Sequence, residues 1–342
     1  MWGKAALALL LLSLLPVALA SASQDPLVCV YFYVWYSDGR HWGEPGHPYW
    51  SVVDVPVRGY YDSRYASTIA WQLGLISGAG VDCLFVSWWG PGSFEDEAAR
   101  LVFERLGDYG LKAALLIEPY LGQDPALYNQ SWWGQTLAYL RDNFIEKYPA
   151  VYLSLEGKPL VLAFNPIGLG YDPSADFPGY AIRIVGNDID NAGYQDWDLW
   201  PDYDAGLTGE LRARRDGYVA IAPRFDDEHF RPGGVPQYDP DLTRGWYQRQ
   251  WQWVLGNLDK VRIVAIYSWN EYHERSHIEP ANNREGRSPY HLYNLTTRYI
   301  GEVKEPGASG RSLSPEAVIA LGLALAALAA ALARLKAAAS KR

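Results

Sequence analysis

Short apolar runs alternate with amphipathic stretches along most of the chain. The runs have the length and the β-branched or aromatic residues of buried strands, and the stretches between them repeat apolar residues at helical spacing. The strand candidates are Val28–Trp35, Asp82–Ser87, Lys112–Ile117, Pro159–Phe164, Tyr180–Val185, Asp204–Leu207, Tyr218–Ala222 and Arg262–Trp269. The clearest helix candidates are Tyr65–Ala79, Glu95–Tyr109, Ser131–Lys147, Gly245–Leu258 and Leu292–Val303.

This alternation predicts an α/β fold, a single (β/α)8 TIM barrel, with an open doubly wound sheet as the second choice. A barrel collects its functional groups at the C-terminal ends of the strands. Polar and aromatic residues do follow the apolar runs there. The clearest cases are Tyr33-Val34-Trp35-Tyr36, Ser87-Trp88-Trp89-Gly90, Glu118-Pro119-Tyr120 and Ser268-Trp269-Asn270-Glu271. No glycine-rich phosphate-binding motif occurs at these turns, so we expect no nucleotide cofactor.

The two ends of the chain differ from its middle. Residues 1–20 combine Lys4, an apolar run and Ala18-Leu19-Ala20, which predicts a signal peptide, with an uncleaved anchor as the alternative. Residues 317–333 are apolar and uncharged, and a basic tail, 334–342, follows them. This predicts a membrane span, or alternatively an Ala-rich helix lying on a surface. We therefore expect residues 21–304, followed by a linker over 305–316, to be exported and anchored at the outer face of the cell membrane.

Composition narrows the possible partners. A net charge of −9 and a pI near 5.2 argue against nucleic acid, which requires a basic footprint. The 15 Trp and 25 Tyr suit stacking on sugar faces, although many must belong to the core. Two cysteines, Cys29 and Cys83, are too few for a disulfide framework, and a single bridge and two buried thiols both remain open. Nothing in the sequence indicates an oligomeric state.

The segment after the last predicted strand carries the strongest chemical signal. Residues 268–280 read Ser-Trp-Asn-Glu-Tyr-His-Glu-Arg-Ser-His-Ile-Glu-Pro. Cleavage of a glycosidic bond needs one carboxyl group that holds a proton and one that is ionised. Glu271 and Glu274 can supply this pair if burial and mutual repulsion separate their pKa values. The alternative is that both are solvated loop charges.

The same segment contains a second motif. His273-Glu274-Arg275-Ser276-His277 matches the H-E-x-x-H pattern of zinc peptidases, in which both histidines lie on one helix. Here the motif follows an apolar strand run, and Pro280 ends any helix soon after it. We therefore predict no metal site and keep a zinc peptidase as the third hypothesis.

Several short motifs together resemble glycoside hydrolase family 99, the endo-α-1,2-mannosidase group. Besides the segment with Glu271 and Glu274, they are Tyr31-Phe32-Tyr33-Val34-Trp35-Tyr36, Tyr60-Tyr61-Asp62-Ser63, Val86-Ser87-Trp88-Trp89-Gly90-Pro91, Ile117-Glu118-Pro119-Tyr120, Phe225-Asp226-Asp227 and Ile278-Glu279-Pro280. They occur in the family's order over nearly the whole domain. The resemblance implies a (β/α)8 barrel that acts on an oligosaccharide or glycan and needs no metal or organic cofactor.

The resemblance also implies a mechanism. Members of this family are thought to use one glutamate as a base on the 2-hydroxyl of the sugar, which then attacks its own anomeric carbon and gives a 1,2-anhydro intermediate. A second glutamate protonates the leaving oxygen and later deprotonates the water that opens the epoxide. Mapped on the motif, Glu271 takes the role of the base and Glu274 that of the general acid/base.

Further residues follow as substrate contacts by the same resemblance. We expect Trp88 and Trp89 to form a stacking floor and Glu118 to accept hydrogen bonds from sugar hydroxyls. Asn270 and His273 are expected to orient the two glutamates. The complete set of predicted substrate-site residues is Tyr33, Tyr36, His41, Trp42, Trp88, Trp89, Glu118, Tyr120, Asn270 and His273.

The chain departs from the family pattern at three places. Val34 stands where the family usually has Pro, Tyr272 where it has Trp, and Arg275-Ser276 where it has Gly-Thr. We expect Arg275 to lower the pKa of Glu274 or to reshape a neighbouring subsite. The chemistry is thus better indicated than the sugar or the linkage, and a non-catalytic glycan-binding protein on the same fold is the second hypothesis.

Overall fold

The computed structural model describes residues 25–42, 52–122, 124–164, 171–186, 196–201, 211–233 and 237–305. The predicted signal peptide, the predicted strand at 204–207, Asn165-Pro166 after the predicted strand at 159–164, the membrane span and the basic tail lie outside these ranges, as does the linker apart from Glu305. Within the described ranges, no helix has the length and apolar character needed to cross a bilayer. Export and anchoring therefore stay predictions.

The described residues contain one continuous sheet of eight parallel strands, in the order β8-β7-β6-β4-β3-β1-β10-β9. The first and last strands of this sheet along the chain, β1 and β10, pair with each other, so the order runs once around, as in a barrel. The strands are β1 (Leu27–Phe32), β3 (Cys83–Trp88), β4 (Lys112–Ile117), β6 (Lys158–Phe164), β7 (Ala181–Gly186), β8 (Trp197–Asp198), β9 (Tyr218–Ile221) and β10 (Ile263–Ile266).

Side chains, rather than a hydrogen-bond ladder, bring the two ends of this sheet together. The rings of Trp197 on β8 and Tyr218 on β9 stack 4.3 Å apart, with 6° between their planes. The Tyr218 hydroxyl donates to the Asp198 carbonyl at 2.7 Å. The barrel is therefore nearly closed, which favours the predicted (β/α)8 fold over an open sheet. The strand in the sixth position is β8, earlier in the chain than the predicted 204–207.

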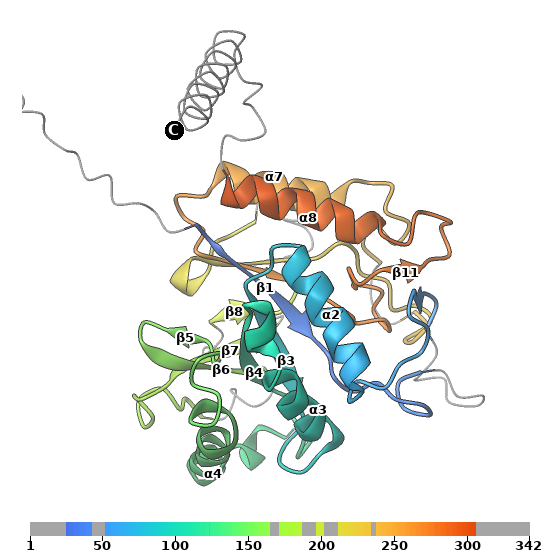
Figure 1. The fold of residues 1–342 in the computed structure, drawn as a ribbon. Coiled ribbons are helices and arrows are strands. Elements are labelled where there is room, and N and C mark those ends of the chain that lie inside the picture. The colour runs from blue at the N-terminus through green and yellow to red at the C-terminus, as the bar shows by residue number, and fades with distance from the viewer. Residues whose placement is uncertain are drawn as a thin grey trace, which may run out of the picture.

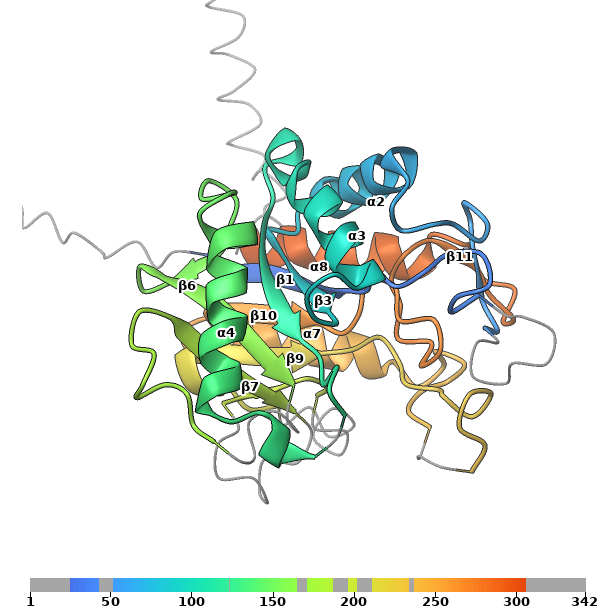
Figure 2. The same cartoon turned by 90° about the horizontal axis from the view of Figure 1, so that it is seen from below.

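Helices lie around the outside of the sheet (Figures 1 and 2). α7 and α8 lie side by side on one flank. The predicted helix at 95–109 divides into α3 and a 3-10 turn, and the one at 131–147 into α4 and a π turn (Arg141–Ile145). The helices are α2 (Ala66–Gly78), α3 (Phe94–Phe103), α4 (Gln130–Leu140), α7 (Trp246–Gly256) and α8 (His291–Lys304). Short strands β2 (Val55–Pro56) and β11 (Ala281–Asn282) pair with each other, and β5 (Ser154–Leu155) pairs with β6.

Successive side chains of each strand enter two different cores, because they alternate across the strand. On β3, Leu84, Val86 and Trp88 belong to the apolar layer between barrel and helices. Cys83 and Phe85 belong to the second cluster, which fills the barrel interior. The same alternation on β1 sends Tyr31 and Tyr33 inward. This parity decides which residues at the strand ends reach the barrel mouth.

A disulfide joins Cys29 and Cys83 inside the barrel. The two residues are register partners on the neighbouring strands β1 and β3, with Cα atoms 4.4 Å apart. This spacing is at the short end of the range that a disulfide spans. The bridge therefore settles the choice that the sequence left open.

Candidate active site

A cavity of about 320 Å³ lies at the C-terminal ends of the strands, where the barrel fold predicts the functional site. Its wall combines aromatic rings with three carboxyl groups. The lining residues are Tyr33, Trp35, His41, Trp89, Glu118, Pro119, Phe164, Leu199, Trp200, Phe230, Arg231, Tyr267, Glu271, His273 and Glu274.

Glu271 is held by its own turn. Its backbone N–H donates to the Ser268 hydroxyl at 2.7 Å, which fixes the start of the turn after β10. Its carboxylate accepts the backbone N–H of His273 at 2.9 Å and lies 3.2 Å from Nδ1 of the same residue. His273 thus lies against Glu271, and both side chains line the cavity.

Glu274 is held from three other segments of the barrel. Oε2 accepts hydrogen bonds from the Tyr267 hydroxyl at 2.7 Å and from the Trp200 indole at 3.1 Å. Oε1 accepts from Arg231 at 3.1 Å. Burial and the nearby charge of Glu271 raise the pKa of Glu274 to about 7, although Arg231 works against this shift. A carboxyl group in this environment suits a proton donor near neutral pH.

Glu118 is a third buried carboxyl group of the cavity. Ser87 donates to its Oε1 at 3.0 Å. Burial raises the pKa of Glu118 to about 8, and the charges of Glu271 and Glu274 add to the rise. Glu118 is therefore mostly protonated at neutral pH and can donate a hydrogen bond to a ligand. Its expected role as an acceptor for sugar hydroxyls stays a prediction.

Three buried ring nitrogens of the lining lack a hydrogen-bond partner. Within the described part of the chain, they are Trp35 Nε1, Trp89 Nε1 and His273 Nε2. A buried polar group without a partner costs about 1–3 kcal/mol, which a bound polar molecule can recover. Because all three residues line the cavity, it is suited to a ligand that carries hydroxyl groups.

The structure brings five of the ten predicted substrate-site residues to the cavity together with Glu271 and Glu274. These five are Tyr33, His41, Trp89, Glu118 and His273. Burial, with the nearby His273 and Arg40, lowers the pKa of His41 to about 3, so this ring is neutral at ordinary pH. The other five predicted residues lie behind the wall or on its outer side.

Tyr36, Trp42 and Asn270 lie behind the wall, which corrects their assignment as substrate contacts. The rings of Tyr36 and Trp42 stack at 4.0 Å, and the Tyr36 hydroxyl donates to the Asn270 carbonyl at 2.7 Å. The Asn270 amide accepts from the Tyr33 N–H and donates to the Tyr33 carbonyl, both at 2.8 Å. Asn270 therefore joins the end of β1 to the turn after β10 and positions Tyr33.

Trp88 and Tyr120 point toward the helices and do not line the cavity, so the expected stacking floor loses Trp88. Trp88 falls on the outward parity of β3 and is fully buried, with its indole donating to Asp96 at 2.9 Å. The Tyr120 hydroxyl accepts from the Trp132 indole on α4 at 3.1 Å. Trp89, the next residue along from Trp88, is the one that reaches the cavity.

Sequence reasoning missed several lining residues. Trp35 lies within the motif Tyr33-Val34-Trp35-Tyr36, where the inward parity of Tyr33 predicts the same side for it, and Tyr267 directly precedes the motif that begins at Ser268. Trp200, Phe230 and Arg231 come from loops without a periodic pattern.

Arg275 points away from the carboxylate beside which it was expected to act. Its guanidinium pairs with Asp54, Asp226 and Glu285 on the far side of the turn. The cation that contacts Glu274 is Arg231. The contacts therefore do not support a direct effect of Arg275 on the pKa of Glu274, and the alternative, a reshaped neighbouring subsite, stays a prediction.

The zinc-peptidase hypothesis lacks its structural basis. Residues 272–275 form a turn and not a helix, so the two histidines do not share a helical face. His273 lies against Glu271, whereas His277 stacks on Tyr272 and lies 3.6 Å from Asp54. Across the described ranges, no three His, Cys, Asp or Glu side chains are grouped so as to hold a metal ion.

Known proteins match the chain both in sequence and in fold. No family model matches it. Two curated proteins named glycoprotein endo-alpha-1,2-mannosidase, from Xenopus laevis and Mus musculus, are each 23% identical to it, over 74% and 73% of this chain and 69% and 67% of their own length. The solved GH99 endo-alpha-mannosidase from Bacteroides thetaiotaomicron is 17% identical and superposes with a TM-score of 0.62 over 82% of this chain and 98% of its own.

A second structure of that enzyme, in complex with bis-tris-propane, gives a TM-score of 0.64 at 17% identity and covers 84% of this chain and all of its own. At such identities the solved structures support the fold alone, and the curated relatives support the resemblance in sequence. The predicted resemblance is thereby confirmed: the chain is similar to glycoside hydrolase family 99.

Proposed function

We propose that this protein is a retaining glycoside hydrolase that cleaves α-mannosidic or related α-linked bonds within glycans. The observation that carries the proposal is that Glu271 and Glu274, from one turn, both line one aromatic-walled cavity. Their surroundings differ, because His273 holds Glu271 and three donors from elsewhere in the barrel hold Glu274. The names of the sequence relatives, which are endo-α-1,2-mannosidases, support the substrate class and the endo action.

Each carboxyl group has one role in each half of the proposed reaction. Glu271 removes the proton of the sugar 2-hydroxyl, whose oxygen attacks the anomeric carbon while the bond to the leaving oxygen breaks. Glu274 gives its proton to that leaving oxygen. In the second half, Glu274 takes a proton from the water that opens the 1,2-anhydro ring at the anomeric carbon, and Glu271 returns its proton to the 2-oxygen. No enzyme atom bonds to the sugar.

The cavity supports both halves. A pKa of about 7 lets Glu274 hold a proton near neutrality and act as a base once it has lost it. Tyr267 and Trp200 fix its Oε2 by hydrogen bonds. The rings of Trp35 and Trp89 offer faces on which a sugar can stack, and the Trp89 N–H lacks a partner in the described structure.

A product assay tests the proposal. We expect the full chain, incubated with a panel of α-linked manno- and gluco-oligosaccharides, to release a fragment from at least one manno-oligosaccharide. Glu271→Gln and Glu274→Gln should each lower kcat by about 10³-fold or more while still binding sugar. Glu146→Gln makes the same chemical change at an exposed site and serves as the control. Binding without any product would instead support the non-catalytic glycan-binding protein, and normal turnover by both variants would remove the assigned roles.

We also propose that the protein is exported and anchored at the outer cell surface by residues 317–333. The Cys29–Cys83 bridge supports export, because disulfides are typical of oxidising compartments. The predicted orientation places the barrel outside and the basic tail inside. Protease added to intact cells should degrade the barrel, and deleting residues 306–342 should release it into the medium. A protein that resists protease until the cells are lysed would contradict this location.

A further inference from the structure

Arg275 has an unusual backbone conformation directly after Glu274. Its φ is 50°, in the left-handed region that residues with a Cβ atom rarely adopt. Such a conformation persists only where the surroundings hold it in place. The Arg275 side chain is also 1% exposed, so a charged group is buried at a strained position. Both features call for a compensating contact.

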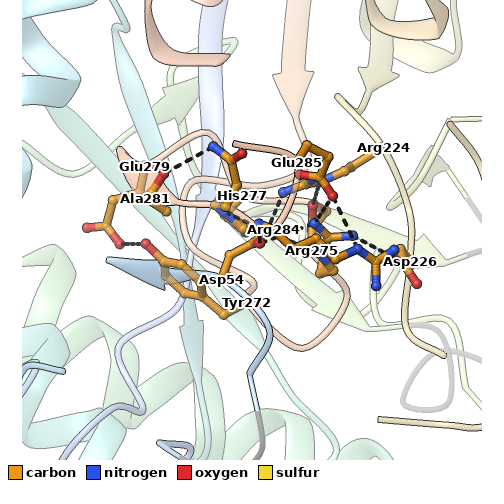
Figure 3. Close-up of polar contacts among 12 residues, drawn as sticks. Asp54, Arg224, Asp226, Tyr272, Arg275, His277, Glu279, Ala281, Arg284 and Glu285 are labelled. Carbon is orange, nitrogen blue, oxygen red and sulfur yellow. Dashed lines mark hydrogen bonds and ion pairs between the residues drawn. The ribbon is translucent and has the colours of Figure 1, made fainter. Parts of the chain in front are cut away.

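The compensating contacts form an ionic group behind the turn (Figure 3). The Arg275 guanidinium lies 3.1 Å from Asp54 and 2.6 Å from both Asp226 and Glu285. A second buried guanidinium, that of Arg224, pairs with Asp54 at 2.5 Å and Glu285 at 3.1 Å. Two buried cations thus share three carboxylates, and a group of this kind is fixed in geometry because each member has several partners.

Arg284 completes the charge balance at the rim of this ionic group. Its guanidinium lies 2.8 Å from Asp226 and 3.2 Å from Glu285, and its side chain is 52% exposed. The Arg284 guanidinium contacts only these carboxylates among the described residues, whereas Arg224 also binds a carbonyl of the turn and Arg275 is part of the turn. Arg284 therefore offers a control for the loss of one positive charge.

The ionic group is connected to the backbone that carries Glu274. Three successive carbonyls of the turn accept hydrogen bonds from outside it. The Glu274 carbonyl accepts the Asp226 N–H at 2.9 Å, and the Arg275 carbonyl accepts Arg224 Nε at 2.6 Å. The Ser276 carbonyl accepts the Ser268 N–H at 2.9 Å. Arg224 thus binds the turn through its side chain, and Asp226 binds it through both its side chain and its backbone N–H.

The Glu274 side chain leaves this backbone on the opposite side. Its carboxylate reaches Tyr267, Trp200 and Arg231 at the cavity, while Arg275 is fixed behind it. A carboxyl group that must meet a leaving oxygen needs its Cα fixed as well as its oxygens. A misplacement of about 1 Å can lower a rate by roughly 10²-fold.

We propose that Arg275 is a positioning residue for proton transfer by Glu274. Its guanidinium, gripped by Asp54, Asp226 and Glu285, holds the left-handed turn and so sets where the Glu274 carboxyl group meets the leaving oxygen. The inference rests on the proposed function, since it concerns the same general acid. It assigns to a buried residue outside the cavity an effect on one step of the reaction.

Two substrates separate positioning from stability. An unactivated α-linked oligosaccharide needs a proton on its leaving oxygen, whereas an aryl α-glycoside with a dinitrophenyl leaving group does not. We expect Arg275→Gly in the full chain to lower kcat/KM about 10- to 100-fold for the oligosaccharide. For the aryl glycoside, kcat/KM of the same variant should stay within about threefold of the wild-type value. Arg284→Gln, which also removes one positive charge from the ionic group, should stay within about threefold for both substrates.

The folded fraction of each variant at the assay temperature is measured by thermal unfolding and used to correct its rates. If Arg275→Gly does not fold, Arg275→Lys keeps the charge, loses the planar fork of donors and should show the same substrate pattern at smaller size. Equal losses on both substrates would overturn the positioning role and leave the proposed function standing. A wild-type protein that cleaves neither substrate would remove the proposed function, and this inference with it.

Discussion

Glu274 and Glu279 lie on the same segment, and burial raises the pKa of each to about 7. Their surroundings are nevertheless opposite. Glu279 borders a pocket of only about 20 Å³, and its carboxyl oxygens accept hydrogen bonds from Tyr61, Gln72, Trp269 and Tyr272. Glu274 lines the cavity of about 320 Å³, next to the charge of Glu271. A raised pKa therefore reports burial, and access to a cavity large enough for a substrate distinguishes a group that can do chemistry from one that joins parts of the fold.

The same contrast divides the whole turn after β10. Glu271, His273 and Glu274 line the cavity, while the residues between and after them pack into the interior. Figure 3 shows the inner side of the turn, where the Tyr272 hydroxyl donates to Glu279 and the Arg275 guanidinium pairs with carboxylates such as that of Asp226. One short segment thus presents reactive groups on one side and fixes itself through the other.

The largest expected effect comes from changing the two glutamates in the same way. Glu274→Gln should lower kcat/KM on an oligosaccharide about 10³-fold or more, because the proton donor is lost, and should leave the melting temperature nearly unchanged or raised. Glu279→Gln should keep most of the activity of the folded protein. Its amide N–H₂ would face hydroxyl and indole donors, so unfolding free energy should fall by about 1–3 kcal/mol. Steady-state kinetics and chemical denaturation measure the two effects.

The comparison breaks if the two variants behave alike. A Glu279→Gln protein that is fully folded yet inactive would show that the enclosed carboxyl group takes part in the reaction. A Glu274→Gln protein with normal turnover would show that access to the cavity does not identify the acid.

A second pair of variants tests the same contrast on adjacent tryptophans. Trp89→Phe removes the N–H that has no partner in the described structure, so kcat/KM should fall by about tenfold with little change in stability. Trp88→Phe leaves Asp96 without its indole donor and opens space in the outer core, so unfolding free energy should fall by about 2 kcal/mol with KM unchanged. If Trp88→Phe raises KM at full stability, the assignment of the two faces of β3 is wrong.

The fold followed from the sequence because long apolar runs and helical periodicity are local signals. The strands at 112–117 and 159–164 match β4 and β6 almost residue for residue. β1 and β10 end earlier than predicted, at Phe32 and Ile266, and Tyr33, Trp35 and Tyr267 beyond them line the cavity. The sequence therefore predicts that a strand ends in a region more reliably than it predicts the last residue that pairs.

The site was only partly predictable, for three physical reasons. β3 is buried on both faces and carries apolar side chains on each, so its sequence does not say whether Trp88 or Trp89 points inward. Arg231 and Trp200 approach Glu274 from other loops, and such contacts depend on the tertiary fold. The direction of Arg275 depends on a positive φ, which is unexpected for a residue other than glycine.

The pH dependence of activity tests the role of Glu274 by a smaller effect than the substitutions. Glu274 must hold a proton to act as the acid, and its pKa is raised to about 7. We therefore expect kcat/KM on an oligosaccharide to fall about tenfold for each pH unit above this value. An aryl glycoside with a good leaving group, which needs no proton, should show a weaker fall over the same range. A profile that stays flat to pH 9 on the oligosaccharide would contradict the role of Glu274 as proton donor.

The smallest expected effect concerns stability and includes carboxyl groups on both sides of the turn. Burial raises the pKa of Glu118 to about 8 and that of Glu274 and Glu279 to about 7, above the ordinary value of 4.5. Each therefore binds its proton more tightly in the folded chain, so its contribution to stability is full below pH 4.5 and is lost as pH rises through 7 to 8. The melting temperature should accordingly decline between pH 6.5 and pH 8.5, above the range in which the lowered pKa values of buried His41 and His277 act in the opposite direction. Glu118→Gln removes one of these titrations without adding a charge and should make the decline shallower, which thermal unfolding at a series of pH values can measure. An unchanged slope in this variant would mean that Glu118 is not buried as a protonated acid. The cavity around Glu118 would then be more accessible to water than the structure shows, and its contrast with the site of Glu279 would be larger.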